Sequence, residues 1–297
     1  MSAIILDGKK LASQIREDLS SKISALQGTL PPALAVVLVG DNEASKIYVR
    51  NKKKAASEIG MICEVLELSS GIGENALLEV INELNSNHHI HGIIVQLPLP
   101  PHINPLHILS AISPQKDVDG FNPYNAGLLS CREDSAIISA TPKGILRLLQ
   151  HSDIELSGKH AVIIGRSNIV GRPAAILMLN QDCTVTITHS KTQNLQALIK
   201  QADIVIAACG SPKLVKKDWI KPGAVVIDVG INRLEGKLCG DVDFEEVSQI
   251  ASYITPVPGG VGPMTVAMLL ENTFEAFQKQ AQTPHPQCHC HHCNHSL

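Results

Sequence analysis

Short apolar runs alternate with longer amphipathic segments along most of the chain. The runs are four to eight residues long and rich in valine, isoleucine and leucine, which is typical of strands buried in a parallel sheet. The segments between them repeat apolar residues at helical spacing. This alternation of strands and helices predicts an α/β fold.

The pattern falls into two series, which predicts two domains. The first series contains predicted strands at 33–39, 62–68 and 92–97 and predicted helices at 8–26, 43–59, 74–86 and 103–112. The second series contains predicted strands at 160–164, 184–188, 204–208 and 224–228 and predicted helices near 171–180 and 193–201. A chain of 297 residues agrees with two domains of roughly 100–200 residues each.

Two irregular stretches separate and follow these series. Residues 113–141 are rich in Pro, Gly, Asp and Asn, so we place the inter-domain connection there. Residues 255–263 open into an amphipathic helix at 264–280, which we expect to return to the first domain. We therefore expect a catalytic domain of residues 1–120 and 264–282, a Rossmann-type domain of residues 140–263, and a disordered His/Cys-rich tail of residues 283–297.

Composition narrows the class of partner. Lys and Arg number 25 against 28 Asp and Glu, so no excess of cations could follow a nucleic-acid backbone. Aromatic residues make up 3% of the chain, which leaves few platforms for stacked bases or for a membrane interface. No apolar stretch approaches the roughly 20 residues that span a bilayer. We expect small-molecule partners, no nucleic acid and no membrane.

Five of the eight cysteines are scattered singly, and three crowd the C-terminal end. Scattered cysteines in a chain without a visible secretory signal are typical of reduced thiols, so we expect a cytoplasmic protein. The C-terminal segment has enough soft ligands for zinc, nickel or copper(I), but its spacing is too crowded for a folded zinc finger. Adventitious metal binding and a tail with no role both stay open, and we assign no metal to the catalytic body. The candidate ligands are Cys288, His289, Cys290, His291, His292 and Cys293.

A glycine turn follows the first strand of the second series. A strand, a turn and a helix N-terminus in this order place backbone N–H groups where a pyrophosphate can sit. Ser167 replaces the middle glycine of the usual G-x-G-x-x-G pattern, so a plain strand-to-helix turn is the alternative. The candidate cofactor-binding residues in this turn are Gly165, Arg166, Ser167, Val170 and Gly171.

The end of the next strand bears on the choice of cofactor. NAD enzymes usually carry a carboxylate there, but here the strand ends in Thr188-His189-Ser190-Lys191. A hydroxyl such as that of Ser190 and a cation such as Lys191 suit a 2′-phosphate, and Arg166 could reach it. We therefore favour NADP. Ile231 lies in a later glycine-containing loop where a cofactor could approach, although such a loop alone is more often just a turn.

Candidate acid/base chemistry lies in the first half. Tyr48 and Lys52 are four residues apart on a predicted helix, so they share one face. They would form an acid/base pair if desolvated, because burial favours the uncharged form of a lysine side chain. Three consecutive lysines more often form a solvated face, so that alternative stays open. Gln96 stands at the carboxyl end of an apolar strand, where α/β sheets hold ligands, although a core glutamine is also consistent.

Asp117 and Asp119 lie two residues apart beside Gly120. A turn, a metal site and a substrate-binding site all use carboxylates in this arrangement. The residues alone do not decide between them.

Together these segments resemble one family, the bifunctional methylenetetrahydrofolate dehydrogenase/cyclohydrolases. Matching blocks extend from residue 6 to about residue 275 and occur in the family's order. The shared blocks are Ser45-x-x-Tyr48-Val-x-x-Lys52, Gly92-Ile-Ile-Val-Gln-Leu-Pro-Leu-Pro100, Lys116-Asp-Val-Asp-Gly120, Gly165-Arg-Ser-x-Ile-Val-Gly-Arg-Pro173 and Pro256-Val-Pro-Gly-Gly-Val-Gly-Pro-Met-Thr265.

The resemblance implies a homodimer of two-domain subunits, with the folate site between the domains. It implies hydride transfer from methylenetetrahydrofolate to NADP and hydrolysis of the methenyl product to formyltetrahydrofolate, within one-carbon metabolism and purine biosynthesis. It makes Lys52 the central cyclohydrolase residue, with Tyr48 and Gln96 orienting it and the substrate, and Asp119 holding the pterin. The further substrate-binding residues that it implies are Ser45, Pro258, Gly259 and Gly260.

One departure from the family concerns the connection between the domains. Many members carry Pro-Cys where this chain has Ser139-Ala140, which bears on the local hinge geometry more than on activity. Thr141 and Pro142 are expected to be the N-cap and first residue of the next helix.

Two other functions stay as alternatives. One is an NADP-dependent dehydrogenase of another small polar substrate, with Lys52 and Asp119 as its proton-transfer pair. The other is a metal-handling protein whose working part is the tail.

Overall fold

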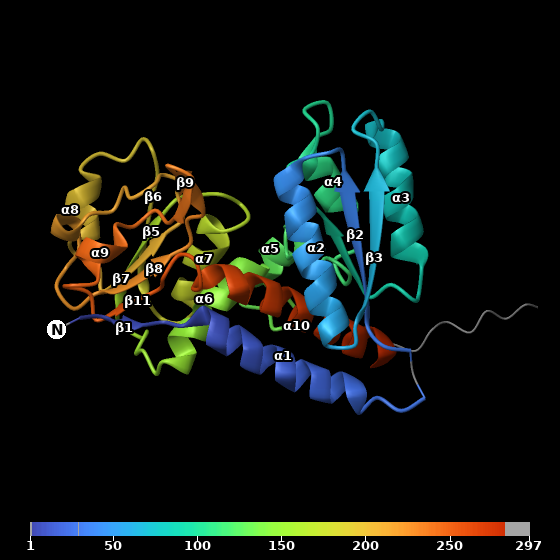
Figure 1. The fold of residues 1–297 in the computed structure, drawn as a ribbon, viewed down its shortest axis with the longest axis horizontal. Helices are drawn as coiled ribbons and strands as arrows, with labels where there is room; N and C mark the ends of the chain where they lie inside the picture. Colours follow the sequence, from blue (N-terminus) through green and yellow to red (C-terminus); the bar gives the residue numbers. More distant parts are fainter. Residues whose placement is uncertain (1, 29, 283–297) are drawn as a thin grey trace, which may run out of the picture.

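The computed structural model describes residues 2–28 and 30–282. It forms two α/β domains side by side, joined by long helices that run between them (Figure 1). This arrangement confirms the expected fold class. The tail that we expected to be disordered, with its candidate ligands Cys288, His289, Cys290, His291, His292 and Cys293, lies outside the described residues.

The smaller domain is built on a three-stranded parallel sheet in the order β3-β2-β4. Its central strand is buried along its whole length because helices cover both faces. Helices α1 and α2 pack on one face, and α3 and α4 pack on the other. The elements are α1 (Gly8–Ser24), β2 (Ala33–Val39), α2 (Glu43–Glu58), β3 (Ile62–Leu68), α3 (Glu74–Ser86), β4 (Gly92–Val95) and α4 (Pro105–Ala111).

The larger domain is built on a six-stranded parallel sheet in the order β1-β11-β8-β7-β5-β6. The strand order reverses at β5, because β6 pairs on one side of it and β7 on the other. A reversal of this kind is the ligand-binding position of doubly wound sheets. Its elements are β1 (Ile4–Ile5), α6 (Ala140–His151), β5 (His160–Ile164), α7 (Gly171–Asn180), β6 (Thr184–Thr188), α8 (Leu195–Ile199), β7 (Ile204–Ala207), a short 3-10 helix (Lys217–Trp219), β8 (Val225–Asp228), the hairpin β9 (Asn232–Leu234) and β10 (Lys237–Cys239), α9 (Phe244–Val247) and β11 (Tyr253–Ile254).

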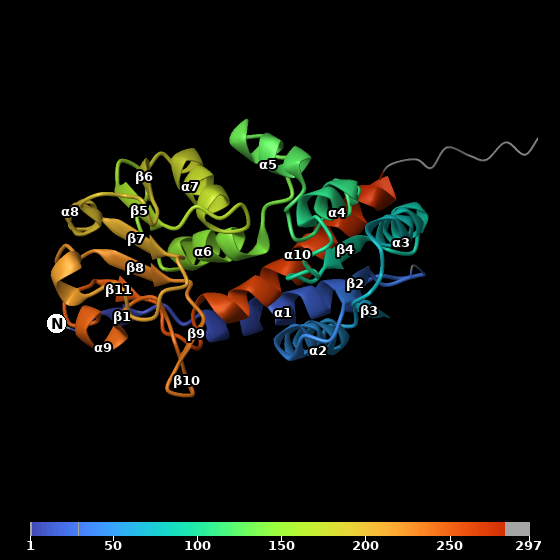
Figure 2. The same ribbon diagram turned by 90° about the horizontal axis from the view of Figure 1, so that it is seen from above.

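The last helix, α10 (Val261–Gln282), runs from the larger domain to the smaller one (Figure 2). It packs against α1 and α6 and also touches β4. Near its end, the amide of Gln280 donates to the carbonyl oxygen of His91, just before β4, at 2.9 Å. The expected return of the final helix to the first domain is therefore confirmed. None of the helices in residues 2–28 and 30–282 has the length and apolarity that crossing a bilayer requires.

The structure differs from the sequence-based expectations where elements are short. We assigned residues 1–120 to the first domain, but Ile4 and Ile5 pair with β11 in the larger sheet. The stretch 113–141, expected to be irregular, contains α5 (Pro123–Ser130). Helix α6 begins at Ala140 with Ser139 as N-cap, so the prediction of Thr141 as N-cap was wrong. The Thr141 hydroxyl instead meets that of Thr265 on α10, at 2.9 Å.

Candidate functional site

Lys52 and Gln96 meet at the carboxyl end of the smaller sheet. The backbone N–H of Gln96 donates to the carbonyl of Val37 at 2.9 Å, so Gln96 continues the pairing of β4 with β2. Nζ of Lys52, on α2, donates to Oε1 of Gln96 at 3.1 Å. Nε2 of Gln96 donates to the carbonyl of Leu97 at 2.8 Å, which fixes the orientation of the amide. The two predicted residues therefore form one pair, and Gln96 is not a core glutamine satisfied only by backbone.

Tyr48 and Ser45 lie one and two turns before Lys52 on the same helix. Tyr48 is 44% exposed, and its hydroxyl forms no hydrogen bond with any residue that the structure describes. Ser45 is buried, and its N–H donates to the N-cap side chain of Asn42 at 3.0 Å. The phenol is thus open to a ligand and is not bonded to the lysine.

The carboxyl group of Asp119 lies near the ammonium of Lys52. Burial raises the pKa of Asp119, and the positive charge of Lys52 opposes that rise. No donor among residues 2–28 and 30–282 bonds to this carboxylate. A desolvated carboxylate without a protein donor is suited to accept hydrogen bonds from a bound molecule.

The neighbours of Asp119 have structural roles. The Lys116 ammonium donates to the carbonyls of Leu84, Asn85 and Asn87 at 2.7–3.1 Å and so closes the end of α3. Asp117 accepts from the backbone of Phe121 and Asn122 and from the Asn125 side chain, at 2.8–3.2 Å. Of the two aspartates, Asp117 anchors the loop, whereas Asp119 accepts no hydrogen bond from the described residues.

Pro258, Gly259 and Gly260 form a loop over the start of α1. The Lys9 N–H donates to the carbonyl of Gly259 at 2.9 Å. A Cβ at Gly8 would collide with the carbonyl oxygen of Gly260, so glycine permits the close approach of the two backbones. The contacts bring this part of the predicted substrate site to the point where α1 and α10 begin.

The turn between β5 and α7, residues 165–171, lies where the strand order reverses. Gly165 has φ +124° and passes so close to the carbonyl of Ala208 that a Cβ would collide with it. A Cβ at Gly171 would likewise meet the backbone of Gly165. The Ser167 hydroxyl accepts from the N–H groups of Val170 and Gly171, at 3.2 and 3.3 Å. The turn therefore has the tight geometry of a pyrophosphate-binding turn, although a serine replaces the middle glycine.

The loop after β6 carries hydroxyls and cations. Thr188 is buried and donates to the carbonyl of Ile163 at 3.1 Å, whereas Ser190, Lys191 and Arg166 are exposed. Ile231, at the start of the β9–β10 hairpin, is 53% exposed. The side chains that can meet a cofactor phosphate at this edge are therefore neutral or positive.

Two aspartates that the sequence analysis missed hold the neighbouring loops. Asp241 accepts from the N–H groups of Cys209, Gly210 and Ser211 at 2.7–2.9 Å. Asp228 accepts from the N–H groups of Gly230, Asp241 and Val242 at 2.9–3.0 Å, and burial raises its pKa to about 6. Their only sequence signal is a carboxylate beside a glycine in an apolar setting, which does not reveal which loops it joins.

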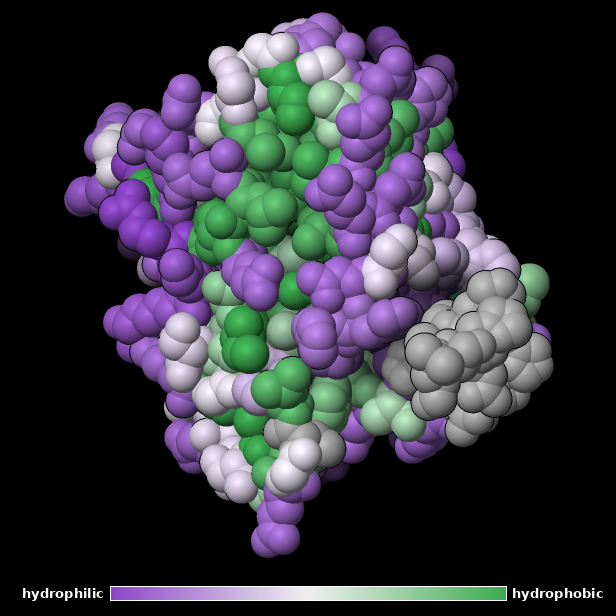
Figure 3. All heavy atoms as spheres, turned by 90° about the vertical axis from the view of Figure 1, so that its right-hand side faces the viewer, coloured by the Kyte–Doolittle hydropathy of each residue, from purple (hydrophilic) through white to green (hydrophobic). Residues whose placement is uncertain are grey.

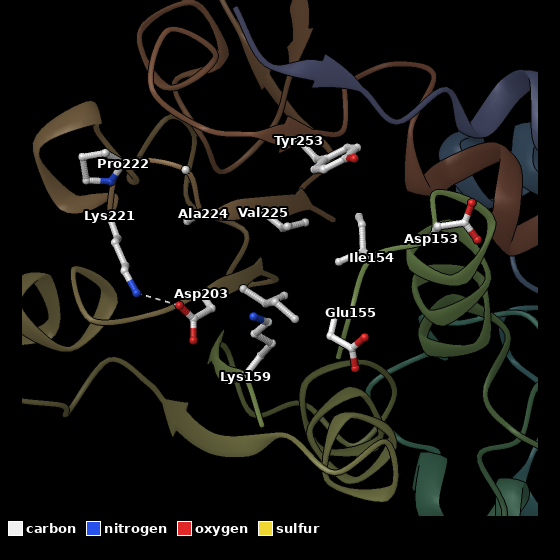
Figure 4. A pocket seen from close by; sticks show the side chains of 12 residues that line it. Asp153, Ile154, Glu155, Lys159, Asp203, Lys221, Pro222, Ala224, Val225 and Tyr253 are labelled. Carbon is white, nitrogen blue, oxygen red and sulfur yellow. Dashed lines mark hydrogen bonds and ion pairs between the residues drawn. The ribbon is translucent and has the colours of Figure 1, made fainter. Parts of the chain in front are cut away.

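A separate cavity of about 280 Å³ lies at the opposite edge of the larger sheet (Figure 4). It is lined by residues that precede β5, β7 and β8, including Lys159, Asp203 and Ala224. Lys221 and Asp203 point toward each other in the close-up, with 2.6 Å between Nζ and Oδ1. The N–H of His160 and the ammonium of Lys221 hold the pKa of Asp203 below its usual range. None of the described residues that we predicted for the site lines this cavity.

The fold and these two arrangements define a class of protein. One domain offers a nucleotide-type turn where its strand order reverses, and the other holds a lysine paired with a glutamine beside a buried carboxylate. This combination is typical of a two-domain, nucleotide-dependent enzyme whose smaller domain carries the groups for proton transfer.

The particular family follows from comparison with known proteins. The profile described as tetrahydrofolate dehydrogenase/cyclohydrolase, catalytic domain, matches residues 6–119, and the profile of the NAD(P)-binding domain matches residues 139–281. This chain belongs to the tetrahydrofolate dehydrogenase/cyclohydrolase family.

Individual relatives match over nearly their whole length. The bifunctional protein FolD of Listeria innocua is 54% identical over 278 residues, which is 93% of this chain and 97% of that protein. A crystal structure of the bifunctional enzyme FolD, methylenetetrahydrofolate dehydrogenase/cyclohydrolase, from Campylobacter jejuni is 51% identical with a TM-score of 0.93, covering 94% of this chain and all of that one. The Trypanosoma brucei dehydrogenase-cyclohydrolase, complexed with NADP and an inhibitor, is 40% identical with a TM-score of 0.91, covering 95% and 100%.

Proposed function

We propose that this protein oxidises methylenetetrahydrofolate to methenyltetrahydrofolate with NADP and then hydrolyses the product to formyltetrahydrofolate. The observation that carries the proposal is the Lys52–Gln96 pair beside Asp119, in a chain whose other domain carries the tight turn at 165–171. The membership of both domains in one bifunctional family supports the same conclusion.

Asp119 orients the substrate. A carboxylate can accept two N–H bonds from the aminopyrimidine edge of the pterin, and Asp119 has no protein donor among the described residues to compete for it. Ser45, Tyr48 and the loop of Pro258, Gly259 and Gly260 border the bound folate. Loss of hydride leaves a stabilised methenyl cation, so this step needs orientation more than a base.

The larger domain holds the cofactor, which supplies the hydride acceptor when bound. The N-terminus of α7 and the turn residues Gly165, Arg166, Ser167, Val170 and Gly171 would hold its pyrophosphate. Ser190 and Arg166 would hold the 2′-phosphate, and the exposed Ile231 would contact the cofactor. The end of β6 carries hydroxyls and cations rather than a carboxylate, which supports NADP over NAD.

Lys52 serves the hydrolytic step. Water attacks the methenyl carbon and loses a proton. One of the two C–N bonds of the tetrahedral intermediate then breaks as its nitrogen gains a proton, which leaves the formyl group on the other nitrogen. The Lys52 amine can transfer these protons, since its hydrogen bond to Gln96 holds it in place. The Tyr48 hydroxyl forms no hydrogen bond with the described residues. It lies one helical turn from Lys52 and can donate to the intermediate.

The protein works as a homodimer in a reducing compartment, the cytoplasm, and feeds purine biosynthesis with formyltetrahydrofolate. Strand β3 pairs with β2 on one side only in the described chain. Figure 3 looks onto the end of the molecule that carries β3, where apolar side chains gather between polar borders, and Ile62 of β3 is 40% exposed. A second copy can continue the sheet across this edge about a twofold axis. The five cysteines in the described part are free thiols, which supports the reducing compartment.

The test uses Lys52→Gln with Lys53→Gln as a matched control from the exposed face of the same helix. Turnover of methylenetetrahydrofolate is followed by absorbance with NADP and with NAD. We expect Lys52→Gln to form reduced cofactor while methenyltetrahydrofolate accumulates, because hydrolysis falls by at least about 100-fold. The control should behave like the wild type. If the wild type reduces neither nucleotide, the proposed function is wrong.

A further inference from the structure

The two ends of the connection between β4's domain and α6, residues 118–120 and 138–139, lie side by side. Gly120 has φ +70°, and a Cβ on it would lie 2.5 Å from the nitrogen of Ser139 and 2.8 Å from the carbonyl carbon of Ile138. The segment after Asp119 is still held on the smaller domain, where Asn122 donates to the carbonyl of Ile112 at 2.8 Å, and the chain enters the larger domain at α6. Asp119, whose carboxylate we propose binds the substrate, is therefore one residue from the contact of Gly120 with Ser139.

Asn272 of α10 connects these two segments, residues 118–120 and 138–139, by hydrogen bonds. It is 2% exposed, and its Nδ2 donates to the carbonyls of Val118 and Ile138, at 2.9 Å each. Its Oδ1 accepts from Lys143 at 2.8 Å, and an ammonium can only donate, so the orientation of the amide is determined. Lys143 is itself held by an ion pair to Glu271 at 3.0 Å. The backbone beside Asp119 is thus fixed to the backbone beside Ser139.

Ser139 extends this connection to the cofactor turn. It occupies the N-cap of α6, where a serine hydroxyl ordinarily accepts from an N–H of the first turn. No such capping bond is present. The hydroxyl, on a side chain that is 1% exposed, donates instead to the carbonyl of Ile169 at 2.8 Å, within the turn 165–171. A proline, which many family members carry here, has neither a hydroxyl nor an N–H to make this contact.

We propose that Ser139 and Asn272 are positioning residues for hydride transfer, because together they fix the cofactor turn relative to the Asp119 loop. The inference rests on the proposed function. Hydride transfer requires the folate carbon and the nicotinamide in contact, so it depends on the relative placement of groups held by different domains. Hydrolysis depends on Lys52, Gln96 and Asp119, which all belong to the smaller domain. Only the dehydrogenase activity should therefore depend on this connection.

The test variant is Ser139→Ala, and Ser252→Ala is its matched control. Ser252 is also a partly buried serine that donates to a backbone carbonyl, that of Ala224 at 3.3 Å, but it lies at the opposite edge of the sheet. Three quantities are measured for each: dehydrogenase kcat at saturating substrates, cyclohydrolase kcat on added methenyltetrahydrofolate, and the Kd of NADP by calorimetry.

We expect dehydrogenase kcat to fall about tenfold in Ser139→Ala, since a small misplacement of reacting groups is costly. Cyclohydrolase kcat should stay within about twofold and the Kd of NADP within about threefold, because the N–H groups of the turn stay in place. The control should change none of the three.

Asn272→Ala should give the same selective loss if it folds, and the Ser139 result stands without it. An equal loss of both activities, a change in NADP affinity alone, or an unchanged dehydrogenase kcat overturns the inference. A wild type that reduces no cofactor instead refutes the proposed function, so the two failures are distinguishable.

Discussion

Three consecutive lysines on α2 differ in what their side chains touch. Lys52 is half-buried and bonds Gln96, whereas Lys53 is exposed and Lys54 lies 3.9 Å from the carboxylate of Glu58 on the same helix. Helical spacing alone indicated which lysine shares a face with Tyr48. The partner of Lys52 lies 44 residues away, so its identity depended on the pairing of β4 with β2.

The titration of Asp117 makes the free energy of unfolding depend on pH. Burial raises its pKa to about 6, although donors from Asn125, Asn122 and Phe121 oppose the rise. A carboxyl whose pKa is higher in the folded state than its unfolded value near 3.9 stabilises the fold at low pH, and this stability is lost as the pH rises through about 6.

Asp117→Asn removes this titration. The stability of the wild type relative to the variant should therefore decrease by about 1 kcal/mol between pH 5 and pH 8. Urea unfolding at the two pH values measures it, and the exposed Asp134→Asn serves as control. A difference that stays constant or grows with pH would contradict the assignment.

At the scale of elements, the long buried segments could be predicted from sequence and the short ones could not. Strands β2, β3, β5 and β6 and helices α3 and α7 have the predicted bounds, because continuous β-branched runs and amphipathic periodicity determine them locally. Strands β1 and β11 have two residues each, and they are strands only through pairing with distant segments, β1 with β11 and β11 with β8. Helix α5 was missed because Pro and Asn at its start indicate a loop as readily as a helix N-terminus.

Part of the candidate site could likewise be predicted from the sequence, and part could not. The residue types and spacing of Tyr48, Lys52, Gln96 and Asp119 were visible in the sequence, and their roles stay predictions. The contacts of Asn272, Ser139 and Asp241 were not visible, because each joins segments that are distant along the chain. Hydrogen bonds between distant segments carry no local periodicity for sequence analysis to detect.

The turn between β5 and α7 gives a prediction for that element. In Gly171→Ala the new Cβ would press on the backbone of Gly165, which cannot move aside as a flexible side chain would. We expect the KM for NADP to rise at least about tenfold while hydrolysis of added methenyltetrahydrofolate is retained. Gly127→Ala is the matched control, because it has open space around its Cβ. An unchanged KM for NADP would mean that this turn does not bind the cofactor.

At the scale of the whole molecule, the free edge of β3 determines the expected assembly. Ile62→Lys places a charge on this edge, where its side chain is already 40% exposed, so the folded subunit should tolerate it. We expect the wild type to sediment as a dimer and the variant to shift toward monomer, with an unchanged circular dichroism spectrum. A wild type that sediments as a monomer at micromolar concentration would refute the homodimer.

The pairing of β1 with β11 has a consequence for synthesis on the ribosome. Ile4 and Ile5 emerge first, but their partners Tyr253 and Ile254 emerge almost last. The three strands of the smaller sheet all lie within residues 33–95, so a nascent chain can complete them early. We therefore expect a chain stalled before residue 253 to hold the smaller sheet while the outer edge of β8 stays uncovered. The finished molecule then forms in one late step, when the first and last strands pair and α10 packs against both domains.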